Sequence, residues 1–252
     1  VHASAEEIGK IYLPAISIVS GPNEAVLALK GTTLDSASSW LAHTKAARDD
    51  YLSLLNCPEQ PGVLDMGQVS AFLRENLPED AIVTNGAGNF TVWPNKFLQY
   101  GPEARMLAPQ SGAMGYGVPA AVMAKAVHPE KLVLCFAGDG DFQMNCQELG
   151  TALQQGACPI ILIINNGTYG TIRMHQERAY PDRVIGTAIE NPDFAALAKA
   201  YGFHGEQVTR TEDFEAAWAR AVASPTGAVL DLIVDPEGIT PRATISKLRS
   251  GG

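Results

Sequence analysis

Two apolar stretches, each followed at once by polar residues, constrain the fold of this chain most strongly. Leu132–Phe136 leads into Gly138-Asp139-Gly140, and Ile160–Ile164 leads into Asn165-Asn166. Residues 143–155, between the two, have the pattern of a helix. The sequence therefore predicts two neighbouring parallel strands joined by a right-handed crossover, with their polar ends at one edge of the sheet.

A carboxylate and an amide that meet at such an edge predict a cation site. Asp139 and Asn166 supply only oxygen ligands toward the metal, which Mg²⁺ prefers, and Mg²⁺ usually keeps phosphate oxygens among its ligands. The N-terminus of the following helix adds free N–H groups and a favourable dipole for an anion. We therefore expect a magnesium ion that holds a diphosphate.

The remaining pattern predicts an α/β fold, with a parallel sheet covered by helices on both faces. Continuous Val, Ile and Leu runs alternate with helical patterns, which is typical of strands buried on both sides. Further strands are expected at residues 81–84 and 228–234, and further helices at 22–29, 66–76, from Gly117 with Pro119 in its first turn, from Asn191 as N-cap, and at 211–223.

Composition narrows the function classes. The 252 residues are 46% hydrophobic and 18% charged, with a net charge of −9, which argues against a nucleic-acid partner. No apolar stretch approaches the ~20 residues that span a bilayer, so we expect no membrane partner. The four cysteines form no C-x-x-C pair and no signal peptide is evident, which favours a cytoplasmic protein.

The chain divides into four segments by pattern. Residues 1–31 contain too few elements to close a sheet, and residues 32–62 have the pattern of a helical connector with apolar positions such as Leu34 and Trp40. The regular alternation of strands and helices occupies residues 63–241, and residues 242–252 are expected to form a C-terminal tail.

Taken together, four motifs resemble the thiamine-diphosphate-dependent enzymes, most closely their acetolactate synthase-like branch. The motifs are Gly112–Ala121, Gly138–Met144, Gln147–Leu149 and Asn165–Gly170. The resemblance covers Val63 to about Pro241 and implies the family's thiamine-diphosphate-binding fold. It also implies that residues 1–31 are a short remnant of a Rossmann-like middle domain.

The resemblance implies a site for thiamine diphosphate and Mg²⁺. The metal ligands would be the side chains of Asp139 and Asn166 and the backbone carbonyl of Thr168. Backbone N–H groups of Gly140 and Asp141 would bind the phosphates, and the Asp141 carboxylate must then turn away or cap the following helix. The other implied cofactor contacts are Ala87, Gly88, Asn89, Gly112, Gly138, Tyr169 and Gly170.

Met114 is the implied cofactor-bending residue. By resemblance, its large apolar side chain forces the two rings of thiamine diphosphate together, while the Gly112 carbonyl and the Met114 N–H hold the pyrimidine. The substrate mouth would include Thr171, Ile172 and His175. Aliphatic Ile172 stands where simple 2-oxo acid decarboxylases often carry a glutamate, which favours carbon–carbon ligation. For His175, both an acid–base role and a plain surface position are open.

In this family a glutamate that activates the cofactor comes from a separate N-terminal pyrimidine-binding domain of the partner subunit. Glu148 follows the phosphate turn and lies at the wrong end of the cofactor. We therefore expect an incomplete fragment, the C-terminal half of an enzyme that decarboxylates or ligates 2-oxo acids. It should be inactive alone and homo-oligomeric when full length.

Two alternatives remain. A nicotinamide dehydrogenase needs G-x-G-x-x-G after an early strand, with an acid about 20 residues later. Gly112, Gly115 and Gly117 give the spacing G-x-x-G-x-G instead. The second alternative, a non-catalytic nucleotide- or diphosphate-binding α/β module, has the same fold and stays open.

Overall fold

The computed structural model describes residues 1–33 and 38–250, and these fall into two compact units, Val1–Ser53 and Leu54–Gly252. The first unit contains η1 (Ala5–Glu7), α1 (Pro22–Leu29) and nearly all of α2 (Ser38–Leu54). Pro22 occupies the first turn of α1, where its missing N–H costs nothing. The helix predicted at residues 22–29 is therefore confirmed, whereas Leu34 lies outside the described residues.

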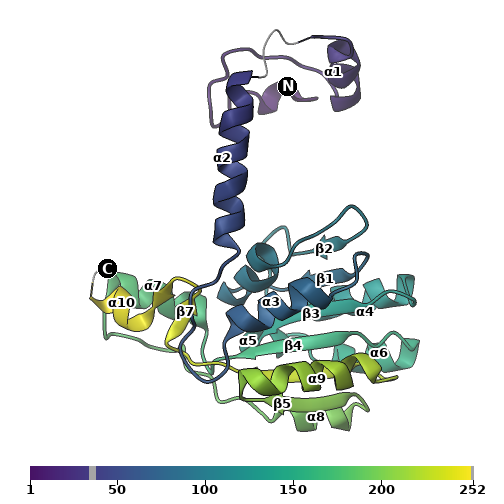
Figure 1. Cartoon of the computed structure of the whole chain (residues 1–252), viewed down its shortest axis with the longest axis vertical. Coiled ribbons are helices and arrows are strands. Elements are labelled where there is room, and N and C mark those ends of the chain that lie inside the picture. The colour runs from purple at the N-terminus through teal and green to yellow at the C-terminus, as the bar shows by residue number, and fades with distance from the viewer. Residues whose placement is uncertain (34–37, 251–252) are drawn as a thin grey trace. The chain divides into compact units, whose positions relative to one another are not determined.

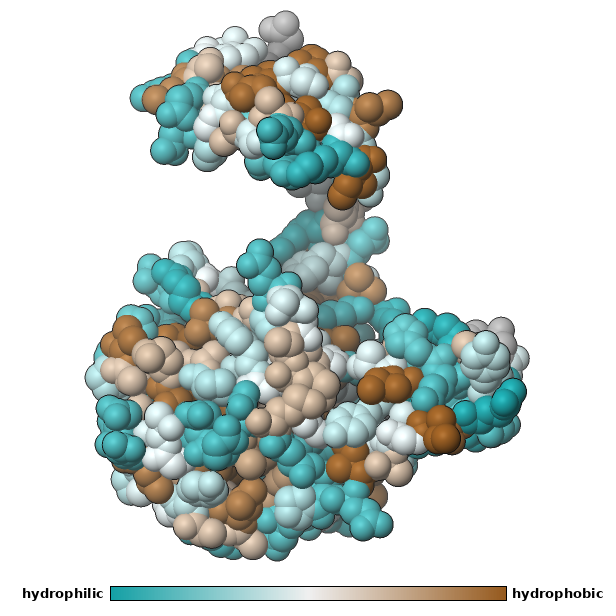
Figure 2. Space-filling model, turned by 180° about the vertical axis from the view of Figure 1, so that it is seen from behind, coloured by the Kyte–Doolittle hydropathy of each residue, from teal (hydrophilic) through white to brown (hydrophobic). Residues whose placement is uncertain are grey.

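The first unit has little core of its own. No side chain among residues 1–33 is buried, and Ile11, Tyr12 and Leu13 are 83%, 84% and 94% exposed. Figure 2 shows hydrophobic residues on the surface of this unit. Residues 1–33 thus form no sheet, in agreement with the sequence pattern.

The second unit is built on a six-stranded sheet in which all neighbouring strands are parallel, in the order β2-β1-β3-β4-β6-β5. This arrangement confirms the predicted α/β class. The structure adds two edge strands, β2 and β5, that the sequence pattern did not predict. The bounds are β1 Ile82–Asn85, β2 Arg105–Leu107, β3 Val133–Gly138, β4 Ile160–Asn165, β5 His204–Val208 and β6 Ala228–Ile233.

Helices cover both faces of the sheet (Figure 1). One face carries α3 (Met66–Asn76), the π-helical turn η3 (Trp93–Phe97) and α9 (Thr211–Ala223), and the other carries α4 (Gly117–Val127), α6 (Glu148–Gln155) and α8 (Phe194–Ala200). Strand β3 feeds both cores, because Leu134 and Phe136 pack on one side and Cys135 and Ala137 on the other. The predicted continuous apolar strands are thus buried on both faces.

The prediction of a helix at residues 143–155 is wrong for residues 143–147. Helix α5 (Asp139–Phe142) ends early, residues 143–147 form turns, and α6 begins at Glu148. The Asn145 side chain donates to the carbonyl of Gly115 at 2.8 Å, a tertiary contact that competes with a regular helix. Gly156, with φ of +62°, then ends α6 in the left-handed conformation.

The helix expected to start at Asn191 starts later. Helix α8 has Asp193 as its N-cap, and the Asp193 carboxylate accepts from the N–H of Ala196 at 2.8 Å. Asn191 is therefore not the cap, and its side chain is free to bond elsewhere.

The segment expected as a tail contains regular structure as far as it is described. A hairpin of β7 (Gly238–Thr240) and β8 (Ala243–Thr244) leads into α10 (Ile245–Arg249), which packs on α7 (Gly170–Ala179). Arg249 on α10 donates to both carboxylate oxygens of Glu177 on α7, at 2.7 and 2.9 Å. Among the helices described, none is long and apolar enough to cross a membrane.

Candidate active site

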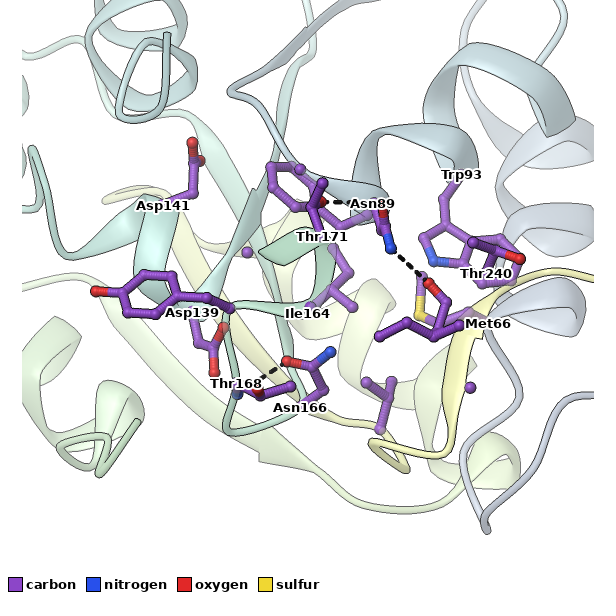
Figure 3. Close-up of a pocket in the computed structure, with 18 of the residues that line it drawn as sticks. Met66, Asn89, Trp93, Asp139, Asp141, Ile164, Asn166, Thr168, Thr171 and Thr240 are labelled. Carbon is purple, nitrogen blue, oxygen red and sulfur yellow. Dashed lines mark hydrogen bonds between the residues drawn. The ribbon is translucent and has the colours of Figure 1, made fainter. Parts of the chain in front are cut away.

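A pocket of about 280 Å³ opens at the carboxyl ends of strands β1, β3 and β4 (Figure 3). This is the edge at which parallel α/β sheets usually bind ligands. Fifteen of the sixteen candidate residues line it, namely Ala87, Gly88, Asn89, Gly112, Met114, Gly138, Asp139, Gly140, Asp141, Asn166, Thr168, Tyr169, Gly170, Thr171 and Ile172.

His175 is the one candidate that does not line the pocket. It is exposed on α7, three residues beyond Ile172. Its position fits the second reading of the sequence, a surface histidine, better than an acid–base role at the pocket.

The three candidate metal ligands lie together on one side of the pocket (Figure 3). Gly138 pairs with Ile164 across β3 and β4, so Asp139 and Asn166 both follow the ends of adjacent strands. Asn166 accepts the N–H of Thr168 at 3.1 Å, which folds the loop so that Thr168 returns toward the same side. The parallel crossover is therefore what joins residues that are distant in sequence.

The electrostatics of this corner fit a divalent cation. Asp139 is only 3% exposed, and burial raises its pKa, while hydrogen bonds from Asn191 and from Gly140 act in the opposite direction. Within the described residues no Lys or Arg forms an ion pair with Asp139. A buried carboxylate without a counter-charge is costly, and a bound cation would supply that charge.

The donor chemistry favours magnesium over zinc. The described residues include no cluster of three His, Cys, Asp or Glu side chains suited to a metal. The available donors are one carboxylate, one amide and one backbone carbonyl, all of them oxygen. Hard oxygen donors suit Mg²⁺, which completes its shell with water or phosphate oxygens. The residues present therefore fit the metal.

We call the part of the pocket that contains the candidate ligands Asp139, Asn166 and Thr168 the metal corner. The side chain of Asp141 faces away from it (Figure 3). Its Oδ1 accepts from the N–H of Gly115 at 2.8 Å and from that of Ala87 at 3.1 Å, while its buried Oδ2 has no partner. A Cβ on Gly86 would lie 1.9 Å from Asp141 Oδ1, so only glycine admits this carboxylate. Burial raises the pKa of Asp141, and the two N–H donors oppose that shift.

This geometry answers the question that the sequence left open for Asp141. Its side chain turns away rather than capping a helix, because it lies inside α5 and bonds to two loops. Two of the residues implied as cofactor contacts have their N–H groups engaged by carboxylates in this structure. Ala87 donates to Asp141, and Gly140 donates to Asp139 Oδ1 at 2.9 Å.

The Asn89 side chain joins three walls of the pocket. Its Nδ2 donates to the carbonyl of Ile239 on β7 at 2.9 Å, and its Oδ1 accepts from the Thr171 hydroxyl on α7 at 2.9 Å (Figure 3). Asn89 itself opens the short helix η2 (Asn89–Thr91) that follows β1. The β7 wall and the α7 wall are thus tied to the loop after β1.

Sequence reasoning missed the polar residues behind Asp139. Asn191 Nδ2 donates to Asp139 Oδ2 at 2.7 Å and to Asn165 Oδ1 at 2.8 Å, and Asn165 Nδ2 donates to Asp231 Oδ1 at 3.0 Å. The signal was Asp231, a carboxylate inside the apolar run that forms β6. A charged residue in a strand buried on both faces indicates a polar partner nearby.

No glutamate lines the pocket in the described part of the chain. Its acidic lining residues are Asp139, Asp141 and Asp235. Glu148 is the first residue of α6 and is not among the lining residues, in line with the interpretation of the sequence.

Comparison with known proteins gives a consistent family match. The family described as "Thiamine pyrophosphate enzyme, C-terminal TPP binding domain" matches residues 86–232. An acetolactate synthase of Arthrospira platensis is 40% identical over 157 residues, which cover 62% of this chain and 27% of that protein. Acetolactate synthase large subunits of Parasynechococcus marenigrum and Cyanidium caldarium are 34% and 31% identical over 210 and 244 residues.

These two alignments cover 82% and 93% of this chain, and 34% and 41% of the respective relatives. The chain therefore spans well under half the length of the curated relatives it matches here. The matched region begins directly after β1 and contains β3 and β4, so it includes the segments that follow all three strands at the pocket.

Proposed function

Because the chain belongs to the thiamine pyrophosphate enzyme family through its C-terminal TPP-binding domain, we propose that its pocket binds thiamine diphosphate together with Mg²⁺. The metal ligands would be Asp139, Asn166 and the Thr168 carbonyl. The observation that carries this proposal is the buried Asp139 carboxylate, which has no basic partner among the described residues and shares one pocket corner with Asn166 and Thr168.

The pocket residues of this chain would position the cofactor. When bound, thiamine diphosphate supplies a carbanion-forming carbon that adds to a carbonyl and accepts the electrons released by decarboxylation. Met114, which lines the pocket, would act as the cofactor-bending residue, and the Gly112 carbonyl would hold the pyrimidine amino group. Gly88, Asn89, Tyr169 and Gly170 would enclose the phosphate end, together with Gly138 and Gly140.

We assign the enzyme to acetolactate synthase-like transferases or lyases that act on 2-oxo acids. Thr171 and Ile172 line the pocket, and Ile172 is 51% exposed, so an aliphatic side chain faces an incoming substrate. An aliphatic group cannot donate a proton, and this supports ligation to a second carbonyl over simple protonation. The similarity to acetolactate synthases supports the same assignment.

The glutamate that activates the cofactor would come from outside this chain. Every acid that lines the described pocket is an aspartate, and two of the three, Asp139 and Asp141, already have partners in the structure. We propose that a pyrimidine-binding domain or a partner subunit supplies the glutamate in a homo-oligomeric full-length enzyme. A general base contributes about 10²–10⁴-fold, so this polypeptide alone should be inactive.

We also propose a cytoplasmic location. All four cysteines are free, and Cys135 is buried beside apolar neighbours in the core. Unpaired cysteines are compatible with a reducing compartment.

Titration calorimetry with the full chain tests the proposed function. Thiamine diphosphate should bind only when Mg²⁺ is present, and Asp139→Ala should abolish that binding, because the carboxylate is the one charged metal ligand. His175→Ala, on the same unit but outside the pocket, is the control and should bind as the wild type does. Binding of NAD, or binding of thiamine diphosphate that ignores Mg²⁺, would contradict the proposal.

A second experiment separates the enzyme from the non-catalytic α/β module. Acetolactate formation from a 2-oxo acid should be absent for the chain alone and should arise when a pyrimidine-binding domain is added. Turnover by the chain alone would refute the claim that the activating group is external, and continued inactivity of the complemented chain would favour the binding module.

A further inference from the structure

A buried polar chain runs behind the metal corner and begins at Asp231 on β6. Asp231 is 1% exposed and shares a strand with the apolar core residues Val229 and Leu230. Its two oxygens accept from different amides, Oδ1 from Asn165 at 3.0 Å and Oδ2 from Gln207 at 3.1 Å. Burial of a carboxylate is unfavourable even when it is hydrogen-bonded, which indicates that Asp231 has a functional role.

Asp231 determines which way the Asn165 amide faces. A carboxylate is an acceptor only, so the NH₂ group of Asn165 must be the part that meets it. The Asn165 oxygen is thereby turned to the opposite side. There it accepts from the NH₂ group of Asn191 at 2.8 Å and from the N–H of Gly167 at 3.3 Å.

Asn191 is oriented by its hydrogen bonds in the same way, and it connects Asn165 to Asp139. An amide NH₂ group carries two hydrogens, and Asn191 directs one to Asn165 Oδ1 and the other to Asp139 Oδ2, at 2.7 Å. Its own oxygen accepts from Gln143 Nε2 at 2.9 Å, so a flipped Asn191 would lose all three bonds. Asp139 Oδ1 meanwhile accepts the N–H of Gly140.

We propose that Asp231 is a positioning residue for the metal site, acting through Asn165 and Asn191 on the Asp139 carboxylate. The inference rests on the proposed function, since it concerns the Mg²⁺ ligand named there. With one oxygen held by Asn191 and the other by Gly140, the carboxylate has a single orientation and presents its remaining lone pairs to the pocket. Partners of this kind change metal affinity by about 10–100-fold.

Asp231→Asn in the full chain is the primary test. The variant keeps the size of the side chain but replaces one acceptor oxygen with an NH₂ group. The amide side chains of Asn165 and Asn191 are then no longer held in a single orientation. Titration of Mg²⁺ at saturating thiamine diphosphate should give a dissociation constant raised about tenfold. Titration of thiamine diphosphate at saturating Mg²⁺ should give the wild-type value, because excess metal refills the site.

Two further variants separate positioning from folding. Asn191 lies in a partly exposed loop, and Asn191→Ala removes the amide that contacts Asp139. This variant should also show a raised Mg²⁺ dissociation constant together with an unchanged value for thiamine diphosphate at saturating Mg²⁺. Val229→Ala, on the same strand as Asp231 and equally buried, should lower the melting temperature without changing the Mg²⁺ dissociation constant. If Asp231→Asn fails to fold, Asn191→Ala decides the question.

The outcomes separate this inference from the proposed function. Wild-type protein that shows no Mg²⁺-dependent binding would refute the proposed function and this inference with it. Wild-type binding with an unchanged Mg²⁺ constant in both Asp231→Asn and Asn191→Ala would overturn the inference alone. An equal loss in Val229→Ala would also overturn it, because the effect would then follow stability.

Discussion

Two replacements of Asp141 should distinguish the contribution of its hydrogen bonds to stability from that of its negative charge. Its carboxylate joins two loops, one after β1 through the N–H of Ala87 and one before α4 through the N–H of Gly115. Both loops contribute residues to the pocket, Gly88 to the first and Met114 to the second. Asp141→Ala removes both bonds, whereas Asp141→Asn keeps an oxygen that can accept them.

The expected magnitude follows from the burial of the two donors. Gly115 is buried, so its unpaired N–H should cost about 2 kcal/mol, and the half-buried Ala87 N–H about 1 kcal/mol. Loss of the carboxylate also removes the unpartnered buried Oδ2, which returns about 1 kcal/mol. Asp141→Ala should therefore destabilise the fold by about 2 kcal/mol, and Asp141→Asn by less than about 1 kcal/mol.

Urea denaturation followed by circular dichroism measures this difference. The experiment is performed near neutral pH without thiamine diphosphate or Mg²⁺, so that ligand binding does not contribute. Linear extrapolation with an unchanged slope then gives the loss of unfolding free energy. The reasoning is refuted if Asp141→Ala is as stable as the wild type, or if Asp141→Asn is the less stable of the two variants.

Two further perturbations test the C-terminal segment and helix α8. Hydrogen bonds from Arg249 lower the pKa of Glu177 to about 2, so their pairing stabilises the fold above the ordinary glutamate pKa of 4.5 and is lost as pH falls from there toward 2. Urea midpoints near pH 6 and pH 3 should therefore differ more in the wild type than in Glu177→Gln, and equal differences would speak against the ion pair. Asp193→Ala removes the N-cap of α8 and should cost about 1 kcal/mol in thermal unfolding, while an unchanged melting temperature would show that the cap is dispensable.

The central strands could be predicted because their cause is local. Strands β3 and β4 are continuous apolar runs that end at glycine or asparagine, and the structure places their ends within two residues of the prediction. Strand β5 has the polar sequence of His204–Val208, and it exists because it pairs with β6 along its length. Strand β2 has only three residues and pairs only with β1. The sequences of β2 and β5 alone therefore do not indicate that these segments pair with strands distant in the chain.

The pocket residues could be grouped from the sequence for the same topological reason. Once two parallel strands are adjacent, the residues after them must share an edge, and this brings Asp139 and Asn166 together. Asn191 could not be placed in this way, because its amide returns to Asp139 through an irregular loop whose path no periodicity encodes. The orientation of Asp141 likewise depends on the close approach of Gly86, which only the tertiary structure determines.

Asp139 and Asp141 are two residues apart and equally buried, yet their surroundings give them opposite tasks. The N–H groups that meet Asp141 come from two separate loops, so its carboxylate holds those loops together. Asp139 receives one amide hydrogen and one backbone hydrogen and keeps lone pairs for the pocket. Of these two carboxylates, only Asp139 is therefore free to face a ligand, and a bound diphosphate would meet less negative charge than the sequence Gly138-Asp139-Gly140-Asp141 suggests. Removing the Asp141 side chain should then affect the two loops more than the proposed metal site.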